Sequence, residues 1–141
     1  MELLSPREGA REDEILLQLH GGGYVGTLHN AYRNFAVLYS ELGNGMSVLT
    51  INYRVAPEHP YPAALEDAVC AYEWLLEKGY DSNRILVAGD SAGGGLALAL
   101  VMYLRDHGAK LPAGIIAMSP WTDLTASGES YQSNYEKDPL F

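Results

Sequence analysis

Short apolar runs alternate with longer amphipathic segments along this sequence of 141 residues. The runs are almost continuously hydrophobic, and they predict strands at residues 14–19, 46–51, 84–88 and 114–118. Apolar residues spaced three and four apart predict helices at residues 32–42, 65–76 and 92–106. Strands that alternate with helices indicate a parallel sheet, and continuous apolar runs are typical of strands covered on both faces. The pattern therefore predicts a three-layer α/β fold with a mostly parallel sheet.

The predicted elements do not cover one another completely. Residues 92–106 are apolar almost all round, which predicts a buried helix. Four parallel strands with three helices leave at least one edge of the sheet open. Residues 119–141 show no clear period that would cover it. We therefore expect residues 1–141 to form a single but incomplete domain that can self-associate through the open edge.

Charge and composition narrow the classes of function. The formal net charge is −9 and no basic patch with interleaved aromatic residues occurs, so nucleic-acid binding has no electrostatic support. The longest apolar run, residues 96–104, is far shorter than the ~20 residues that a membrane span requires. No apolar signal segment is visible at the start of the sequence, so we expect a soluble and, by default, cytoplasmic protein. The single cysteine, Cys70, is expected to be a small buried side chain and not a reactive thiol.

A serine between the third predicted strand and the last predicted helix is the first candidate for chemistry. Residues 89–93 read Gly-Asp-Ser-Ala-Gly, which is the Gly-x-Ser-x-Gly pattern in the strand–turn–helix context that it requires. A sharp turn strains the backbone at the central residue, so the positions two before and two after it need to lack side chains. The N-terminus of the following helix stabilises developing negative charge. Ser91 is therefore a candidate nucleophile, although a glycine-rich turn that happens to contain serine fits the same pattern.

A second glycine-rich segment follows the first predicted strand. Residues 20–23 read His-Gly-Gly-Gly, at the place where an α/β-hydrolase carries the loop whose backbone N–H groups bind the oxyanion. Glycines allow that backbone to approach a substrate carbonyl without an intervening Cβ. The N–H group of Ala92, directly after the candidate nucleophile, is expected to be a further donor. Residues 20–26 are therefore a candidate oxyanion loop.

The same segment also satisfies the dinucleotide-binding fingerprint Gly-x-Gly-x-x-Gly, at residues 21–26. That interpretation requires an acidic residue at the end of the next strand to bind the ribose, where this sequence has Asn52 and Tyr53. The next helix also begins several residues after the last glycine, and residues 89–94 stay unexplained. A dinucleotide-binding domain is therefore the weaker alternative.

Four sequence blocks, in their order along the chain, resemble the hormone-sensitive lipase family of α/β-hydrolase-fold esterases. The blocks are residues 20–23, 53–58, 89–94 and 119–124. The resemblance implies that Ser91 is the nucleophile and that the oxyanion hole consists of the backbone N–H groups of Gly22, Gly23 and Ala92. It also implies that Gly21 shapes the loop and that His20 is structural. Two positions depart from the family pattern, with Gly95 where asparagine is common and Val55 where leucine is common.

The family's catalytic acid and histidine lie beyond the Ser-Pro-Trp block, and its cap includes segments outside the given sequence. The resemblance therefore implies that residues 1–141 lack the triad partners of Ser91 and are inactive alone. We expect the other histidines to be surface or structural residues, namely His29, His59 and His107. No pair of these has the spacing of metal ligands, so we expect neither a metal nor another cofactor.

Other polar residues receive supporting roles. Asp90 is expected to organise the loop, Asp67 to be solvated or to cap its helix, and Asp138 to lie in the segment that leads into the cap. Arg54 and Glu58 are expected to brace the loop near the site. Tyr24 is expected to line the substrate pocket.

Together these inferences predict a carboxylic ester hydrolase that cleaves a small-molecule ester through a serine acyl-enzyme. The alternative from another class is a non-catalytic small-molecule receptor on the same scaffold. The plant gibberellin receptor is such a case, since it resembles this family but lacks the catalytic histidine. The residue that separates the two alternatives lies outside residues 1–141.

Overall fold

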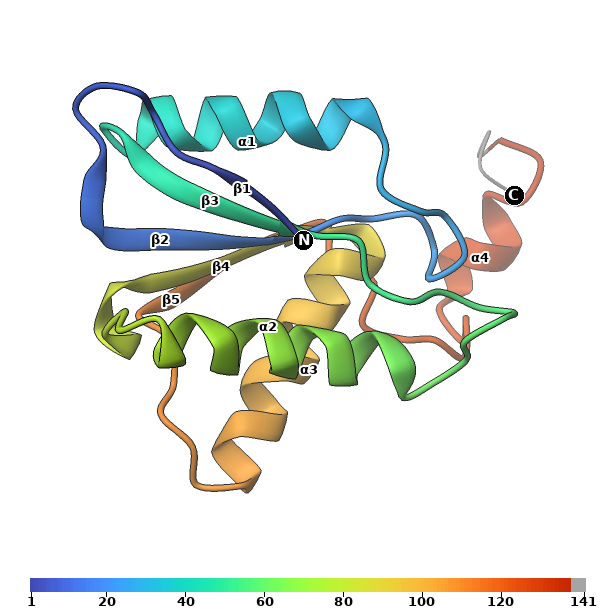
Figure 1. Cartoon of the computed structure of the whole chain (residues 1–141). Coiled ribbons are helices and arrows are strands. Elements are labelled where there is room, and N and C mark those ends of the chain that lie inside the picture. Colours follow the sequence, from blue (N-terminus) through green and yellow to red (C-terminus); the bar gives the residue numbers. More distant parts are fainter. Residues whose placement is uncertain (138–141) are drawn as a thin grey trace.

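The protein is built on a five-stranded sheet with helices on both faces (Figure 1). The computed structural model describes residues 1–137, apart from the side chain of residue 12. The strands are β1 (Glu2–Leu4), β2 (Arg11–Leu19), β3 (Met46–Ile51), β4 (Ile85–Asp90) and β5 (Gly114–Met118). The helices are α1 (Asn30–Leu42), α2 (Ala63–Glu77), α3 (Ser91–Asp106) and α4 (Glu129–Ser133), with a 3-10 turn, η1 (Ser82–Arg84), before β4. The sheet order is β1-β3-β2-β4-β5, in which β1 runs antiparallel to β3 and all other neighbours are parallel.

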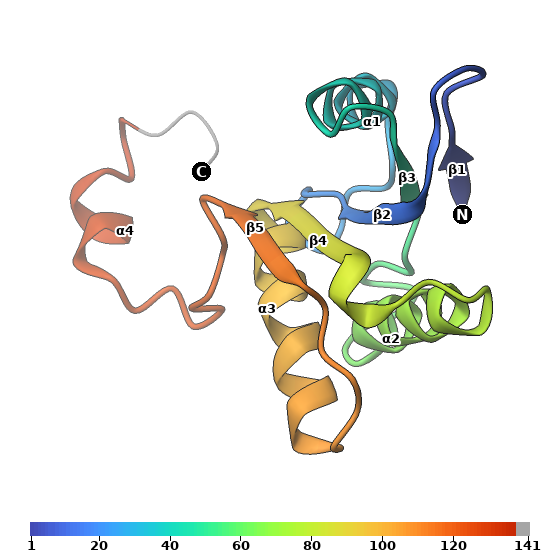
Figure 2. The ribbon, with the colours of Figure 1, turned by 90° about the vertical axis from the view of Figure 1, so that its left-hand side faces the viewer.

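Helices lie on both faces of the sheet, as the hydrophobic pattern predicts. α1 lies on one face, whereas α2 and α3 lie on the other (Figures 1 and 2). The larger core lies under α2 and α3, where Leu17, Leu75 and Leu100 are fully buried. A smaller core under α1 contains Leu16 and Val48. Because neighbouring residues of β2 point into opposite cores, residues 15–17 and Leu19 are all apolar, and the buried Gln18 accepts a hydrogen bond from Thr50 at 2.8 Å.

All of the predicted strands and helices form, with boundaries that shift by a few residues. β1 and α4 were not predicted, because elements of three and five residues are too short to show a period. β2 starts at Arg11, earlier than its apolar run, and a register shift between Arg11 and Ile15 precedes its regular pairing with β3. No helix among the described residues has the length and apolar character to cross a bilayer.

Three expectations about burial are wrong. α3 is buried only along the side that faces the sheet, because Met102 and Tyr103 on its outer side are 54% and 37% exposed. β5 is not covered on both faces, since the Ile116 side chain is 41% exposed. Cys70 is exposed, because α2 packs through the stripe that contains Tyr72 and leaves Cys70 on its outer surface.

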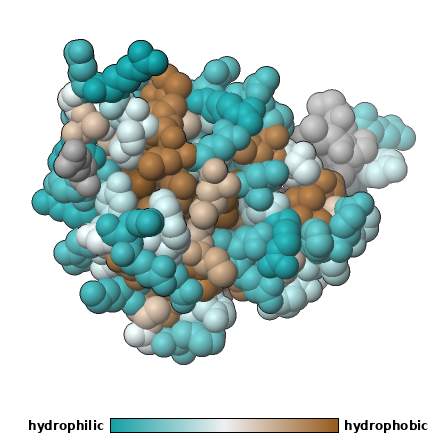
Figure 3. All heavy atoms as spheres, in the orientation of Figure 1, coloured by the Kyte–Doolittle hydropathy of each residue, from teal (hydrophilic) through white to brown (hydrophobic). Residues whose placement is uncertain are grey.

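The two edges of the sheet are β1 and β5, and no strand of residues 1–137 pairs with the outer side of either. Figure 3 shows a band of apolar side chains on the surface in the region of β1, where Met1 and Leu3 are 68% and 53% exposed. At the other edge, Met118 is 39% exposed. The open edge expected from the sequence is therefore present, at both ends of the sheet.

A buried and an exposed leucine provide a test of where the core lies. Leu100→Ala removes a fully buried side chain of α3 and leaves a cavity, so we expect a loss of about 2–5 kcal/mol in the free energy of unfolding. Leu42→Ala makes the same chemical change at a position that is 74% exposed, and we expect a change below about 0.5 kcal/mol. Urea denaturation followed by circular dichroism measures both variants. Equal losses would contradict the assigned core.

Candidate active site

The predicted nucleophile occupies a strained turn between β4 and α3. Ser91 is the first residue of α3, directly after β4, and its φ of +50° lies in the left-handed region. A Cβ at Gly89 would collide with the backbone of Gly93, and a Cβ at Gly93 would collide with the carbonyl oxygens at the end of β2. Both outer glycines of the Gly-x-Ser-x-Gly pattern are therefore required by the close approach of backbone.

The parallel pairing of β2 with β4 brings the two glycine-rich segments together. Leu19 lies opposite Gly89 in the register of these parallel strands, so both segments leave the sheet at its carboxyl end. The next residues along each strand direction are His20 and Asp90, which begin the candidate oxyanion loop and the serine turn. The arrangement places the loop beside the serine, although Gly21 and Asp90 are 69 residues apart in the sequence.

Asp90 and Tyr32 fix the start of the oxyanion loop. The Gly21 N–H group donates to the Tyr32 hydroxyl oxygen at 2.7 Å and to Oδ1 of Asp90 at 3.1 Å. The Tyr32 hydroxyl in turn donates to Oδ2 of Asp90 at 3.1 Å. A Cβ at Gly21 would lie 2.5 Å from Oδ2 of Asp90, so only glycine fits there. Asp90 therefore organises the loop, as predicted.

Sequence reasoning missed the role of Tyr32. In the sequence, Tyr32 is one of several apolar residues at helical spacing, and nothing indicates that its hydroxyl has a polar partner. The structure buries the side chain to 7% exposure and turns the hydroxyl toward the loop. Burial raises the pKa of Tyr32, which keeps its hydroxyl protonated and able to donate.

The middle of the loop folds back on itself and leaves backbone donors unused. Gly22 and Gly23 have φ values of +118° and +63°, and the Gly22 carbonyl accepts from Val25 and Gly26 at 3.1 and 2.7 Å. Among the described residues, the N–H groups of Gly22 and Gly23 donate to no acceptor. The N–H group of Ala92 lies in the first turn of α3, where a helix offers no internal acceptor.

His20 supports this loop from within the core. Its ring is fully buried and stacks on Tyr53, with ring centroids 4.1 Å apart and planes inclined by 5°. Nδ1 lies 2.7 Å from the Gly21 carbonyl oxygen, and the Tyr53 hydroxyl donates to the His20 carbonyl at 2.6 Å. Burial is the main cause that lowers the pKa of His20, so the ring is neutral near pH 7 and its Nδ1 is the protonated nitrogen.

The segment after β5 clamps the serine turn from the other side. The Trp121 N–H group donates to the Ser91 carbonyl at 2.8 Å. The Pro120 Cα lies 3.0 Å from the position that a Cβ would take at Gly94, and a Cβ at Gly95 would collide with the Trp121 carbonyl oxygen. Glycine at position 95, where the family commonly has asparagine, thus lets the segment pack directly on α3.

The other predicted polar residues lie farther from the serine. Arg54 donates through its backbone N–H and its guanidinium to Asp67 at 2.8 and 2.9 Å, and it also pairs with Glu66. Asp67 is therefore neither free in solvent nor a helix cap, which corrects the sequence interpretation. Glu58 is exposed and forms no ion pair among the described residues. The expectation for Asp138 falls outside the described residues.

No histidine within residues 1–137 hydrogen-bonds to Ser91. The three exposed histidines are His29, His59 and His107. The ring of His29 contacts Tyr32, and His107 ends α3 with its ring stacked on Tyr103. The described residues also contain no group of three or more histidine, cysteine or acidic side chains placed to hold a metal ion.

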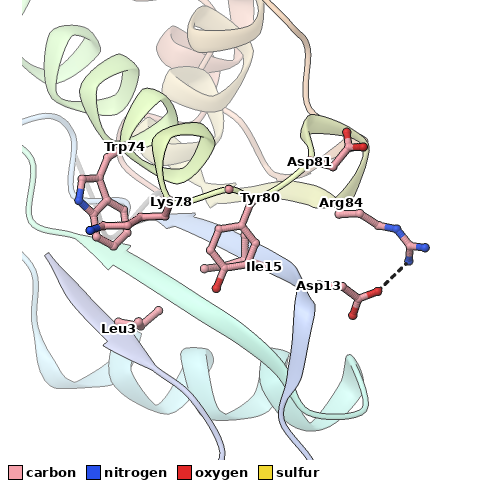
Figure 4. A pocket seen from close by; sticks show the side chains of 9 residues that line it. Leu3, Asp13, Ile15, Trp74, Lys78, Tyr80, Asp81 and Arg84 are labelled. Carbon is pink, nitrogen blue, oxygen red and sulfur yellow. Dashed lines mark ion pairs between the residues drawn. The ribbon is translucent and has the colours of Figure 1, made fainter.

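Two of the hollows on the α2 side of the sheet differ in character. The larger, of about 650 Å³, is lined at the amino ends of β2 and β4 by polar and aromatic side chains, among them Trp74 beside Lys78 and the ion pair of Asp13 with Arg84 (Figure 4). It is remote from Ser91, which follows the carboxyl end of β4. The smaller, of about 240 Å³, is lined by Tyr24 together with apolar side chains of α2 and α3.

Known proteins share both the sequence and the fold. An acetyl-hydrolase from Streptomyces hygroscopicus is 46% identical over 134 residues, which are 93% of this chain and 44% of the relative. A crystal structure of an esterase/lipase from an uncultured bacterium is 43% identical, with a TM-score of 0.86 over 94% of this chain and 45% of its own. An esterase from the bacterial hormone-sensitive lipase family is 47% identical, with a TM-score of 0.81 over 94% of this chain and 44% of its own.

The chain thus spans about half the length of the relatives that it matches. A model of the α/β-hydrolase fold matches residues 16–141, which include both glycine-rich segments. The match and these relatives show that the chain belongs to the hormone-sensitive lipase family of α/β-hydrolase-fold proteins.

Proposed function

We propose that the protein is a carboxylic ester hydrolase in which Ser91 attacks the ester carbonyl and forms an acyl-enzyme. One observation carries the proposal: among residues 1–137, the backbone N–H groups of Gly22, Gly23 and Ala92 have no acceptor, and they lie at the carboxyl end of the sheet, where the strained Ser91 follows β4. Relatives that are named acetyl-hydrolase and esterase support ester hydrolysis as the reaction class. The loop thus offers donors to a group that the protein itself does not supply.

These donors suit the tetrahedral intermediate of acyl transfer. Attack by the serine hydroxyl moves negative charge onto the carbonyl oxygen, and fixed N–H groups stabilise that charge without having to reorient. The N-terminus of α3, on which Ser91 stands, adds its positive end to the same place. Removal of one such donor typically lowers kcat by about 10²–10³-fold.

The general base is proposed to come from sequence beyond residue 141. A serine hydroxyl is a weak nucleophile near neutral pH unless a base accepts its proton. No histidine of residues 1–137 hydrogen-bonds to Ser91, and the ring of His20 is buried with Nδ1 held at the Gly21 carbonyl. The relatives are about twice as long as the matched region, which leaves room for an acid and then a histidine downstream.

The first prediction concerns the nucleophile. In the complete enzyme a fluorophosphonate probe should label Ser91, and Ser91→Ala should abolish both labelling and hydrolysis of nitrophenyl acetate. Ser133→Ala, an exposed serine in α4, serves as the matched control and should leave both unchanged. Peptide mapping by mass spectrometry locates the label. A label on another residue, or hydrolysis that survives Ser91→Ala, would remove Ser91 from the proposed mechanism.

The second prediction concerns the missing base. Residues 1–141 alone should hydrolyse nitrophenyl acetate no faster than an oxyanion hole without a triad allows, which is about 10³–10⁴-fold over water. A fusion to the part of the Streptomyces acetyl-hydrolase that follows the matched region should restore Ser91-dependent turnover. Strong Ser91-dependent turnover by residues 1–141 alone would place the base within them.

The third prediction concerns the anchor of the oxyanion loop. Tyr32→Phe removes one acceptor from the Gly21 N–H group and one donor from Asp90, so the loop loses part of its fixed position. We expect kcat of the complete enzyme to fall by about tenfold or more, with KM nearly unchanged, because misplaced donors weaken binding of the transition state. Tyr135→Phe, at a side chain that is 67% exposed, is the control. An unchanged kcat in Tyr32→Phe would show that this anchor does not position the donors.

A further inference from the structure

We propose that the larger hollow, at the amino ends of β2 and β4, is a binding site for a small aromatic carboxylate. This inference does not depend on the proposed function. The volume of the hollow, about 650 Å³, lies within the range of about 300–1,000 Å³ that is typical of small-molecule pockets. β1, β2, α2 and the segment that joins α2 to β4 all contribute side chains to it (Figure 4). A hollow of this size accommodates an acid with one or two aromatic rings.

The hollow and the predicted nucleophile lie at opposite ends of β4. Arg84, which lines the hollow, directly precedes this strand, whereas Ser91 directly follows it. The six residues of the strand span about 20 Å, at ~3.3 Å for each residue. A small molecule in the hollow therefore touches neither the serine turn nor the oxyanion loop, and the site is separate from the candidate active site.

Lys78 gives the hollow a positive charge that no carboxylate of residues 1–137 neutralises. Its ammonium lies 5.3 Å from the ring centroid of Trp74, which stands one turn earlier on α2 (Figure 4). The attraction between the ammonium and the face of the ring holds the charge at the wall of the hollow. The net charge of −9 is spread over the whole chain and is screened beyond about 8 Å at physiological salt, so the nearby ammonium dominates. An anion is therefore the favoured charged group at this end of the hollow.

The other charged side chains of the hollow are engaged with partners of their own. Arg84 pairs with Asp13 at 3.4 Å. The Asp81 carboxylate accepts from the backbone N–H group of Asn83 at 3.0 Å, and its negative charge disfavours an anion nearby. Figure 4 shows these groups at the end of the hollow away from Lys78. The charges thus orient an anionic ligand, with its carboxylate toward Lys78.

The uncharged walls of the hollow favour an aromatic body for that ligand. Trp74 and Tyr80 contribute rings, and Leu3 and Ile15 contribute apolar side chains from β1 and β2 (Figure 4). Both rings are only partly buried and Leu3 is 53% exposed, so a bound ring would remove apolar surface from water. Aromatic side chains also pack on another ring in offset or edge-to-face arrangements. An aromatic carboxylate therefore matches the rings with its body and Lys78 with its charge.

The test titrates the complete protein with naphthoate and, separately, with its uncharged amide, naphthamide. Both should bind saturably in isothermal titration calorimetry, and the acid should bind about three- to fivefold more tightly, as an exposed ion pair allows. Lys78→Gln should abolish that preference, and Lys78→Arg, which retains the charge, should keep it. Lys78 is exposed, so neither change disturbs the core. Lys137→Gln makes the same change at an exposed lysine after α4 and should leave the preference as it is.

Nuclear magnetic resonance locates the bound acid. The indole N–H signal of Trp74, identified by its loss in Trp74→Phe, should shift during the titration, whereas that of Trp121, which adjoins the serine turn, should not. A shift confined to Trp121 would place the acid near Ser91 and overturn the inference. A preference for the acid that survives Lys78→Gln would also overturn it. So would the absence of saturable binding by the complete protein, as when further chain fills the hollow.

Discussion

The parallel pairing of β2 with β4 is the constraint on which the candidate site depends. It sets Leu19 opposite Gly89, so the chain leaves both strands at the carboxyl end of the sheet. The chain continues differently after the two strands. After β4 it enters α3 at once, and the first turn of α3 lies so close to the end of β2 that Gly93 has no room for a Cβ. Any side chain there would push α3 away from the carbonyl oxygens of Leu19 and His20. The predicted nucleophile and the predicted oxyanion donors would then separate.

The loop after β2 contains two kinds of backbone N–H group, those that donate within the protein and those that do not. The N–H group of Gly21 has two acceptors, Tyr32 and Asp90, and both side chains are held by one another. Below it, the neutral ring of His20 and the hydroxyl of Tyr53 fill the space under the loop with short hydrogen bonds and a stacked contact. A loop supported in this way needs no reorganisation during a reaction, because its polar groups are already oriented. The N–H groups of Gly22 and Gly23, which follow Gly21, have no acceptor within residues 1–137.

Sequence reasoning predicted the layers and the two glycine-rich segments because both are local signals. The apolar run of β2 indicates that the strand is buried on both faces. Gly89 and Gly93 indicate a sharp turn around Ser91. The polar contacts between distant segments carry no such signal. Tyr32 looks like a core residue at helical spacing, and Asp67 looks like a solvated carboxylate until Arg54 is placed beside it. The exposure of Cys70 likewise depends on which stripe of α2 faces the sheet, and a helix that is apolar on several sides does not reveal that.

The departure at Gly95 links the serine turn to the hollow beside Tyr24. A Cβ at this position would collide with the carbonyl oxygen of Trp121 and would lie 3.4 Å from the hydroxyl of Tyr24. A chain with asparagine here would have to hold both groups farther from α3. Because glycine is present, the segment after β5 packs on α3 and its Trp121 N–H group donates to the Ser91 carbonyl, while the Tyr24 hydroxyl lies close to Gly95. The absence of a side chain at Gly95 therefore brings two groups close to the same point of α3: the Trp121 backbone, which donates to the Ser91 carbonyl, and the hydroxyl of Tyr24, whose side chain lines the apolar hollow.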